Sequence, residues 1–331
     1  MTGHKSTVLV VGGAGYIGSH MVKDLVEAGH DVVCLDNFST GHKDLTGNQR
    51  VIQGDLGDSK VLGDLFSAYK IHAVMHFAAF SLVGESVEDP LKYYHNNIGQ
   101  TIELLDVMIR NEVKTFIFSS SAAVYGEPLE VPIVEDHPCK PTNPYGATKI
   151  ALEHLLESCG HAYGLKYAAL RYFNAAGADP SATIGERHDP ESHLIPLVLK
   201  VATAQRDHIK VFGTDYPTPD GTCIRDYVHV NDLTKAHLLA LEALYEGAEN
   251  EVYNLGSSTG YSVREVVDVA RKVTGHAIPA VDSERRHGDP AVLIASSEKI
   301  RQDLGWKPKY EDLTNIVQTA WAWHQKEAKQ K

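Results

Sequence analysis

Short apolar runs alternate with longer amphipathic stretches through the first half of the chain. The apolar runs predict strands at Thr7–Val11, Asp31–Leu35, Ala73–Phe77, Thr115–Ser119 and Tyr167–Tyr172. Helical periodicity predicts helices between them at Gly18–Ala28, Ser59–Tyr69, Leu91–Arg110 and Pro144–His161. Continuously apolar strands separated by helices indicate a parallel sheet with helices on both faces. We therefore expect an α/β fold with a doubly wound, Rossmann-like parallel sheet.

The pattern changes after Ala178, where the chain becomes rich in Asp, Pro, Gly and His up to residue 225. Further elements are predicted at Leu194–Gln205, Ile209–Phe212, Val228–Leu244, Glu251–Leu255, Ser262–Thr274 and Leu313–Gln325. The helix at Ser262 opens with a capping box, Ser262-x-x-Glu265. We expect a dinucleotide-binding domain of residues 1–178, with returning segments at about 226–256. A smaller α/β substrate domain is expected from residues 179–225 and 257–331.

Composition narrows the class of protein. The chain has 331 residues, of which 43% are hydrophobic and 22% charged, a globular composition. No apolar stretch is long enough to span a membrane, and the short run before Gly12 is no signal peptide. The net charge of −12 argues against nucleic acid or an anionic membrane as partners. Four scattered cysteines fit a cytoplasmic location, and the 18 histidines show no metal-ligand spacing, so no metal is expected.

A glycine triplet follows the first predicted strand. Gly12, Gly15 and Gly18 have the spacing G-x-x-G-x-x-G and lead into the first predicted helix. Such a turn lets a pyrophosphate approach the backbone N–H groups at a helix N-terminus. Asp36, at the end of the next strand, is placed to accept hydrogen bonds from a ribose and to repel a 2′-phosphate, which favours NAD over NADP. Asp55 either contacts the adenine end of the cofactor or only closes a turn.

Tyr145 and Lys149 are four residues apart at the start of a predicted helix capped by Asn143, and so share one face. An ammonium beside the phenol lowers the pKa of Tyr145, which makes the phenolate a usable general base. Ser121, beyond the predicted strand Thr115–Ser119, is placed to relay a substrate proton to Tyr145. Ser119 and Ser120 are expected to cap backbone groups in a turn.

Several motifs in the same order resemble the extended short-chain dehydrogenase/reductase family, and within it the enzymes that epimerise UDP-hexoses at C4. They are the glycine turn, SSSAAVYG from Ser119, YGATK from Tyr145, RYFN from Arg171, GTCIRDYVHV from Gly221, YNLG from Tyr253 and RHGD from Arg286. The resemblance covers nearly the whole chain. It implies a homodimer, one NAD retained per subunit, and a UDP-hexose between the domains that is interconverted between UDP-glucose and UDP-galactose through a 4-keto sugar.

Position by position, the resemblance assigns catalysis to Tyr145, Ser121 and Lys149. It assigns NAD contacts to Gly12, Gly15, Tyr16, Ile17, Gly18, Asp36, Asn37, Asp55, Leu56, Phe77, Ala78, Ala79, Asn96, Tyr145, Lys149 and Tyr172. Substrate contacts fall on Ser121, Tyr145, Asn174, Phe212, Arg225, Arg286, Asp289 and Leu293. Asn174, Arg225 and Arg286 correspond to residues that hold the diphosphate, for which arginine supplies bidentate donors.

The sequence departs from the family in three places. Ser81 replaces a lysine close to NAD, and Pro190–Leu194 differs from the Asn-Asn-Leu form of relatives. Leu293 takes the gate position beside the sugar, where some members have tyrosine, so activity on UDP-N-acetylhexosamines is expected too. Alternatives are a nucleotide-sugar 4,6-dehydratase or decarboxylase, and a nucleotide-sensing binding protein. Ala122 and Ala123 argue against the first two, because they stand where those enzymes need acid or base side chains.

Overall fold

A computed structural model describes residues 5–286 and 289–330, so that His287 and Gly288 of the RHGD motif lie outside the described residues. The chain packs into two compact units. Unit 1 contains residues 1–126, 138–171 and 234–253. Unit 2 contains residues 127–137, 172–233 and 254–331. Compared with the boundaries expected from sequence, unit 2 also takes in residues 127–137, 172–178, 226–233 and 254–256.

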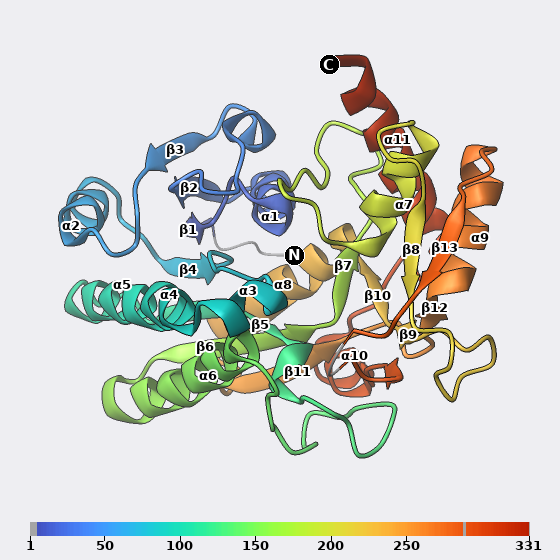
Figure 1. Ribbon diagram of the computed structural model, residues 1–331. Coiled ribbons are helices and arrows are strands. Elements are labelled where there is room, and N and C mark those ends of the chain that lie inside the picture. Colours follow the sequence, from blue (N-terminus) through green and yellow to red (C-terminus); the bar gives the residue numbers. More distant parts are fainter. Residues whose placement is uncertain (1–4, 287–288, 331) are drawn as a thin grey trace. The chain divides into compact units, whose positions relative to one another are not determined.

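A seven-stranded sheet forms the centre of unit 1, in the order β11-β6-β5-β4-β1-β2-β3 (Figure 1). The pairs from β5 through β4, β1 and β2 to β3 are parallel. The sequence prediction of a doubly wound parallel sheet is thus confirmed. The strands are β1 (Thr7–Val11), β2 (Asp31–Asp36), β3 (Arg50–Gln53), β4 (Ala73–His76), β5 (Thr115–Ser121), β6 (Lys166–Tyr172) and β11 (Glu251–Leu255).

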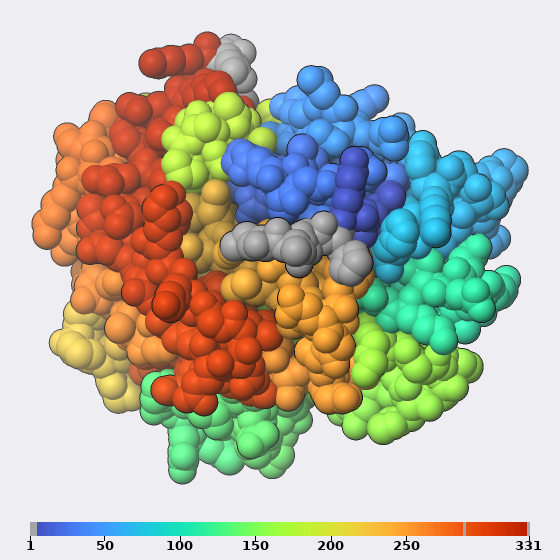
Figure 2. Space-filling view, turned by 180° about the vertical axis from the view of Figure 1, so that it is seen from behind, coloured from blue at the N-terminus to red at the C-terminus, as the bar shows by residue number. Residues whose placement is uncertain are grey.

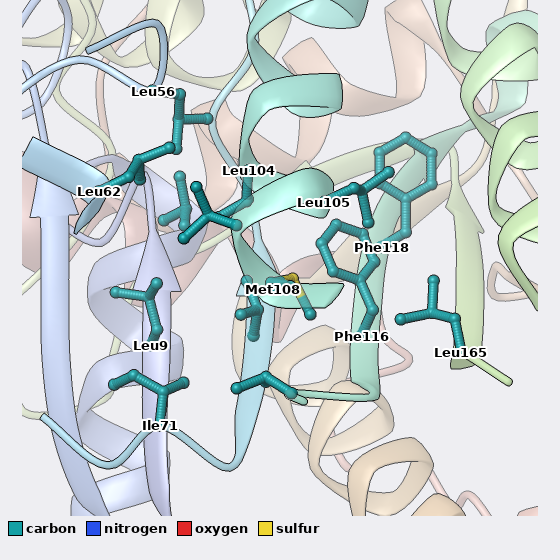
Figure 3. Packing of buried hydrophobic residues seen from close by; sticks show 14 of the residues in the cluster. Leu9, Leu56, Leu62, Ile71, Leu104, Leu105, Met108, Phe116, Phe118 and Leu165 are labelled. Atoms are coloured by element: carbon teal, nitrogen blue, oxygen red, sulfur yellow. The ribbon is translucent and has the colours of Figure 1, made fainter. Parts of the chain in front are cut away.

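Amphipathic helices bury the apolar faces of this sheet. The helices are α1 (Tyr16–Glu27), α2 (Ser59–Ala68), α3 (Val83–Glu88), α4 (Pro90–Tyr93), α5 (Gln100–Arg110), α6 (Pro144–Tyr163) and α8 (Val230–Tyr245), with short turns η1 (Lys43–Thr46), η2 (Tyr94–Gly99) and η3 (Ala122–Val124). Figure 3 shows Leu9 and Phe116 of the sheet packed with Leu62 of α2 and Leu104 of α5. Val8 and Val10 are fully buried too, and strand alternation turns them toward the opposite face. Both faces are therefore covered.

The predicted helix Leu91–Arg110 is interrupted in the structure. Residues Tyr94–Gly99 form a π-helical segment, η2, between α4 and α5. Asn97 within it is buried, and its side chain accepts from the Phe80 N–H at 2.9 Å and donates to the Thr148 hydroxyl at 3.1 Å. A π-bulge shifts the helical register, which directs one side chain away from the regular face. Asn97 thereby joins the loop after β4 to α6.

Unit 2 has a core of its own, around Leu199, Val266 and Ile316. Its helices are α7 (Leu194–Ala202), α9 (Val263–Thr274), α10 (Glu298–Leu304) and α11 (Leu313–Gln330). Its strands are β7 (Asn174–Ala176), β8 (Ile209–Phe212), β9 (Ile224–Arg225), β10 (Tyr227–His229), β12 (Tyr261–Ser262), β13 (Ala280–Ser283) and β14 (Val292–Leu293). The predicted capping box at Ser262 is present. Helices α9 and α11 pack together, and their orange and red residues form a continuous surface in Figure 2.

Candidate active site

A pocket in unit 1 lies at the carboxyl ends of the first four strands. Ten of the predicted cofactor residues line it: Gly12, Gly15, Asp36, Asn37, Asp55, Leu56, Phe77, Ala78, Ala79 and Asn96. Seven further lining residues were not predicted from sequence: Val11, Leu35, Ser39, Thr40, Gly54, Phe80 and Gln100. Tyr16, Ile17, Gly18, Tyr145 and Lys149 do not line this pocket, and Tyr172 belongs to unit 2. Neighbouring parallel strands end at one edge, which is where open α/β sheets bind ligands.

The three glycines of the triplet are required for two different reasons. Gly12 has a φ of +76°, and a Cβ there would lie 2.6 Å from the backbone nitrogen of Ala78. A Cβ on Gly18 would lie 2.0 Å from the carbonyl oxygen of Gly12. Gly15 lines the pocket, and a Cβ there would have only the Gly12 carbonyl oxygen within 4 Å, at 3.3 Å. Packing therefore explains Gly12 and Gly18, whereas Gly15 keeps room for a ligand close to the backbone.

The start of α1 suits an anion. Gly15 is the N-cap residue and offers no capping side chain, and the first turn contains no acidic residue. No carboxylate in the first turn of the helix itself therefore balances the positive end of the helix dipole. Together with the space at Gly15, this start fits the pyrophosphate of a dinucleotide.

Asp36 is 8% exposed at the end of β2. Its two carboxylate oxygens accept backbone N–H groups of Ala14 in the glycine turn, at 2.9 Å, and of Phe38, at 2.8 Å. Each carboxylate oxygen has a second lone pair, so Asp36 can hold the glycine turn in place and still accept from a ribose hydroxyl. Asp55 accepts from the Gly57 N–H at 2.9 Å and so closes a turn; it also lines the pocket, and its contact with the adenine end of the cofactor stays a prediction.

Tyr145, Lys149 and Ser121 are brought together at the junction of β5 and α6. Asn143 caps α6 through its side chain, as predicted, by accepting from the Gly146 N–H at 2.9 Å. The Ser121 side chain lies close enough to Tyr145 to lower the pKa of its phenol, and it also accepts from the Ala123 N–H at 3.2 Å. The amine of Lys149 is buried, donates to the Ser119 carbonyl oxygen at 2.8 Å and lies 5.8 Å from the centre of the Tyr145 ring. This arrangement can move a proton along Ser121 and Tyr145.

The expected lowering of the Tyr145 pKa is wrong. Burial raises the pKa of Tyr145, and the Ser121 side chain opposes that rise only in part. Burial also lowers the pKa of Lys149 to about 7, against the attraction of Glu153. An amine that is only partly protonated near neutral pH is a weak source of positive charge for the phenol. The sequence pattern could not show this, because desolvation depends on the surrounding fold.

The lowered Lys149 pKa predicts that the stability of the protein rises with pH. Below pH 7 the folded and unfolded chains both carry the proton, and the folded chain bears the cost of a buried ammonium. Between pH 7 and 10.5, its usual pKa, only the unfolded chain keeps the proton. The free energy of unfolding should therefore rise by up to about 1.4 kcal/mol per pH unit. Urea unfolding of the wild type and of Lys149→Met from pH 7 to 10 measures this, and equal slopes for both proteins would contradict it.

A buried charge network next to Lys149 was not found from sequence. Arg171 binds Glu153 through two hydrogen bonds, at 3.0 and 2.5 Å, and donates to the Tyr125 hydroxyl at 2.8 Å. Ser120 donates to the same Glu153 at 2.5 Å. Ser119 and Ser120 are thus residues of β5 with specific partners, and the expectation of two turn-capping serines is wrong. The only available signal was the position of Glu153, four residues after Lys149.

Gly146 is a second residue whose role the sequence did not reveal. A Cβ at Gly146 would lie 2.3 Å from the Ala123 carbonyl oxygen, so the first turn of α6 packs directly on the backbone of η3. This close contact positions Tyr145 beside the strand end that carries Ser121. Glycine between a tyrosine and an alanine in YGATK was a possible signal, but its partner is distant in sequence.

In unit 2, five of the six predicted substrate residues contact another of the set, and Asn174 contacts the neighbouring Asp226. The guanidinium of Arg225 binds the Asp289 carboxylate, and Arg286 lies over the Phe212 ring, 4.3 Å from its centre. Asn174 in β7 donates to the Asp226 carbonyl oxygen at 2.8 Å. Leu293 in β14 is paired with Arg225 in β9. The six residues come from four segments of the chain, around residues 174, 212, 225 and 286–293.

Comparisons with known proteins agree with this geometry. The sequence model of the NAD dependent epimerase/dehydratase family matches residues 8–256. A UDP-glucose 4-epimerase of Halalkalibacterium halodurans is 54% identical over 317 residues, which cover 96% of this chain and 95% of the relative. A crystal structure of a UDP-glucose 4-epimerase is 53% identical, with a TM-score of 0.95, and the match covers 97% of this chain and 98% of that one.

A UDP-glucose 4-epimerase from Brucella ovis, solved in complex with NAD, is 48% identical, with a TM-score of 0.93 and coverage of 96% of this chain and 97% of that one. The matches to these relatives extend over both units. The chain therefore belongs to the NAD dependent epimerase/dehydratase family and, within it, to the UDP-glucose 4-epimerases.

Proposed function

We propose that this chain interconverts UDP-glucose and UDP-galactose, with NAD as its cofactor, through transient oxidation of the sugar at C4. The observation that carries this proposal is the constellation of Ser121, Tyr145 and Lys149 at the end of β5. Family membership over nearly the whole chain supports it. The Brucella ovis relative was solved with NAD, and the pocket beside the glycine turn has the features that such a cofactor needs.

The chain's own residues provide the proton path. Tyr145 accepts the proton of the sugar 4-hydroxyl, and Ser121 bridges the two. Because burial raises the pKa of Tyr145, an added positive charge has to stabilise the phenolate. Bound NAD supplies that charge in its nicotinamide ring and serves as the hydride acceptor. Lys149 is held close to the Tyr145 ring by its hydrogen bond to the Ser119 carbonyl oxygen. When protonated, its ammonium lowers the pKa of the Tyr145 phenol.

The residues after Ser121 favour epimerisation over elimination or decarboxylation. Ala122 and Ala123 form the turn η3, and neither can transfer a proton. We propose that Asn174, Arg225 and Arg286 hold the diphosphate of the substrate, and that Phe212 and Asp289 hold the uridine. Strong binding of the nucleotide and weak binding of the hexose would let the 4-keto sugar rotate in the site. It would then take the hydride back on its opposite face.

Incubation of the purified protein with UDP-galactose, without added NAD, tests the proposed function. We expect UDP-glucose as the only new nucleotide sugar, because the cofactor stays bound and is regenerated in each cycle. A 4-keto-6-deoxy sugar would show a dehydratase, and released carbon dioxide would show a decarboxylase. Product that forms only after NAD is added would contradict a retained cofactor.

The glycine turn gives a prediction on cofactor retention. Gly18→Ala places a Cβ 2.0 Å from the Gly12 carbonyl oxygen, so the turn must shift. We expect at least about tenfold less NAD in the purified variant, since the pyrophosphate contacts depend on this turn. Absorbance and enzymatic assay of released NAD measure the content. Gly63→Ala in α2 is the matched control, because a Cβ there meets nothing within 4 Å, and its NAD content should equal that of the wild type.

Leu293 gives a prediction on the sugar. We propose that the protein also epimerises UDP-N-acetylglucosamine, because leucine at this position leaves room for an N-acetyl group that a tyrosine would fill. Leu293→Tyr should lower kcat/KM for UDP-N-acetylglucosamine by at least about tenfold, which is about 1.4 kcal/mol. Its activity on UDP-glucose should be retained. Absence of wild-type turnover of UDP-N-acetylglucosamine would contradict this proposal.

We also propose that the protein acts as a homodimer. Large apolar side chains are exposed along α3, α4, η2 and α5, where Val87 is 63% and Leu91 is 69% exposed and Val83, Tyr94 and Ile102 accompany them. Apolar side chains that gather on one surface commonly mark a protein interface. Sedimentation equilibrium measures the molecular mass. A monomer at micromolar concentration would contradict the proposal.

The structure bears on location in two respects. No helix of the described residues has the length and apolar character needed to cross a membrane. All four cysteines are free thiols. The cytoplasmic location stays a prediction, for which the free thiols are the support.

A further inference from the structure

The loop between β7 and α7 in unit 2 gathers four side chains that can ligate a metal ion. These are Glu186, His188, Glu191 and His193, whose candidate ligand atoms all lie within 4.8 Å of one another. No other group of this kind occurs among residues 5–286 and 289–330. We propose that this cluster binds Zn²⁺ and that the bound ion stabilises the loop between β7 and α7.

The distances fit a tetrahedral ion. Bonds of about 2.1 Å from zinc to nitrogen and oxygen require neighbouring donor atoms roughly 3.4 Å apart. The Nδ1 atom of His188 lies 3.0 Å from a carboxylate oxygen of Glu186 and 3.9 Å from one of Glu191. The Nδ1 atom of His193 lies 3.9 Å from the same Glu191 oxygen and contacts the same Glu186 oxygen. Shifts of about 0.5 Å would bring these three distances to tetrahedral values, and the closer His193–Glu186 contact would have to open by about 1 Å.

The chemistry of the four ligands favours zinc over the commoner hard cations. Two imidazole nitrogens and two carboxylate oxygens match the donors that Zn²⁺ accepts. Calcium takes six to eight oxygen ligands, and magnesium keeps several water molecules, so neither suits a set that is half imidazole. Two carboxylates also balance the charge of one divalent ion.

The two carboxylates of the cluster are buried, while the imidazoles of His188 and His193 are 28% and 49% exposed. The side chains of Glu186 and Glu191 are only 4% and 3% exposed. Buried carboxylates need a positive partner. Glu191 is further fixed because it accepts the backbone N–H groups of Ser192, at 2.8 Å, and His193, at 3.0 Å. Ligands that other groups hold in place are typical of metal sites.

Helix α11 fixes the loop from the other side. The indole nitrogen of Trp323 donates to the Glu186 carbonyl oxygen at 2.9 Å. A Cβ on Gly185 would lie 2.4 Å from the Trp323 ring, so only glycine allows this close packing. His193 is also the N-cap residue of α7. An ion on this cluster would therefore tie together the loop, the start of α7 and the site of contact with α11. With four protein ligands the site is closed, which indicates a structural role and not a catalytic one.

Metal titration of the tag-free, full-length protein, with its NAD content verified, tests the proposal. After treatment with EDTA and removal of the chelator, we expect one Zn²⁺ per chain in competition with a chromophoric chelator. Co²⁺ should give the intense visible absorption of a tetrahedral site. A wild-type protein that binds no Zn²⁺ at tens of micromolar, or a Co²⁺ spectrum of the weak octahedral kind, would overturn the site. Neither measurement depends on a variant that might misfold.

Two variants locate the ion. His188→Gln combined with His193→Gln should weaken Zn²⁺ binding at least about 100-fold and abolish the tetrahedral Co²⁺ spectrum. His161→Gln, which removes an exposed imidazole from α6, should leave both unchanged. Zn²⁺ should raise the thermal midpoint of the wild type and of His161→Gln, but not that of the double variant, because only a folded site binds the ion. Equal zinc binding by the double variant would place the ion elsewhere and overturn the proposal.

Discussion

Tyr145→Phe should lower kcat for the conversion of UDP-galactose by about 10²- to 10⁴-fold, the usual contribution of a positioned acid or base. The substitution removes the phenolic hydroxyl that Ser121 influences and that the proposed proton path requires, while the ring near the Lys149 amine is kept. The ring, which packs at the start of α6, remains. We therefore expect the NAD content and the KM for UDP-galactose to stay close to those of the wild type. Steady-state kinetics with verified NAD content measure this.

Tyr163→Phe is the matched control for this prediction. Tyr163 ends the same helix, is 54% exposed and has no role in the proposed proton path. Its kcat should stay within about twofold of the wild type. If Tyr145→Phe also kept full activity, the proton path would be refuted, and the nucleotide-sensing protein considered from sequence would gain support. If the Tyr145→Phe variant were purified without NAD, the main role of Tyr145 would be to bind the cofactor.

The second large effect is expected on stability. Glu153→Leu leaves the buried Arg171 guanidinium without its carboxylate, and Arg171→Met leaves the carboxylate without its guanidinium. Each single substitution should cost about 3–5 kcal/mol of unfolding free energy, because an uncompensated charge remains buried. The double variant should be much more stable than the sum of the two losses predicts, since no buried charge is left. Urea unfolding of all four proteins, followed by circular dichroism, gives the coupling.

An exposed ion pair provides the comparison. Lys60 and Asp64 lie four residues apart on α2 with exposed side chains, and Asp64→Asn should change stability by no more than about 1 kcal/mol. If single substitutions at Glu153 or Arg171 lower the free energy of unfolding by no more than about 1 kcal/mol, the buried pair would contribute no more to stability than an exposed ion pair does. Its place next to Lys149, whose charge Glu153 favours, would then need another explanation.

Features that depend on residues close together in the sequence could be predicted, and features that depend on distant residues could not. The strands Thr7–Val11 and Glu251–Leu255 have the predicted bounds, because their apolar runs end at turn-forming residues. The capping of α6 by Asn143 was also predictable, because the cap and its N–H partner are three residues apart. In contrast, the predicted helix Leu91–Arg110 is broken by η2. The cause is a set of bonds from Asn97 to residues 17 and 51 positions away.

The same distinction applies to the candidate site. The glycine triplet, Asp36 and the Tyr145–Lys149 pair could be found from sequence because the chemistry that they serve imposes local spacing. The Arg171–Glu153 pair, the contact of Gly146 with Ala123 and the four-ligand cluster at Glu186 could not. The ligand spacing Glu-x-His-x-x-Glu-x-His fits neither a helix nor a strand, and only the folded loop brings the four side chains to one point.

The sequence by itself therefore determined the doubly wound α/β fold and the dinucleotide turn, and it supplied the candidates for the proton-carrying side chains. Hydrophobic periodicity and motif spacing act over a few residues and can be read along the chain. The tertiary structure alone decided the protonation tendencies of Tyr145 and Lys149, opposite to the expectation for the tyrosine. It also decided which buried charges are paired. The physical reason is that desolvation and long-range pairing depend on how much water and which distant groups the fold leaves around each side chain.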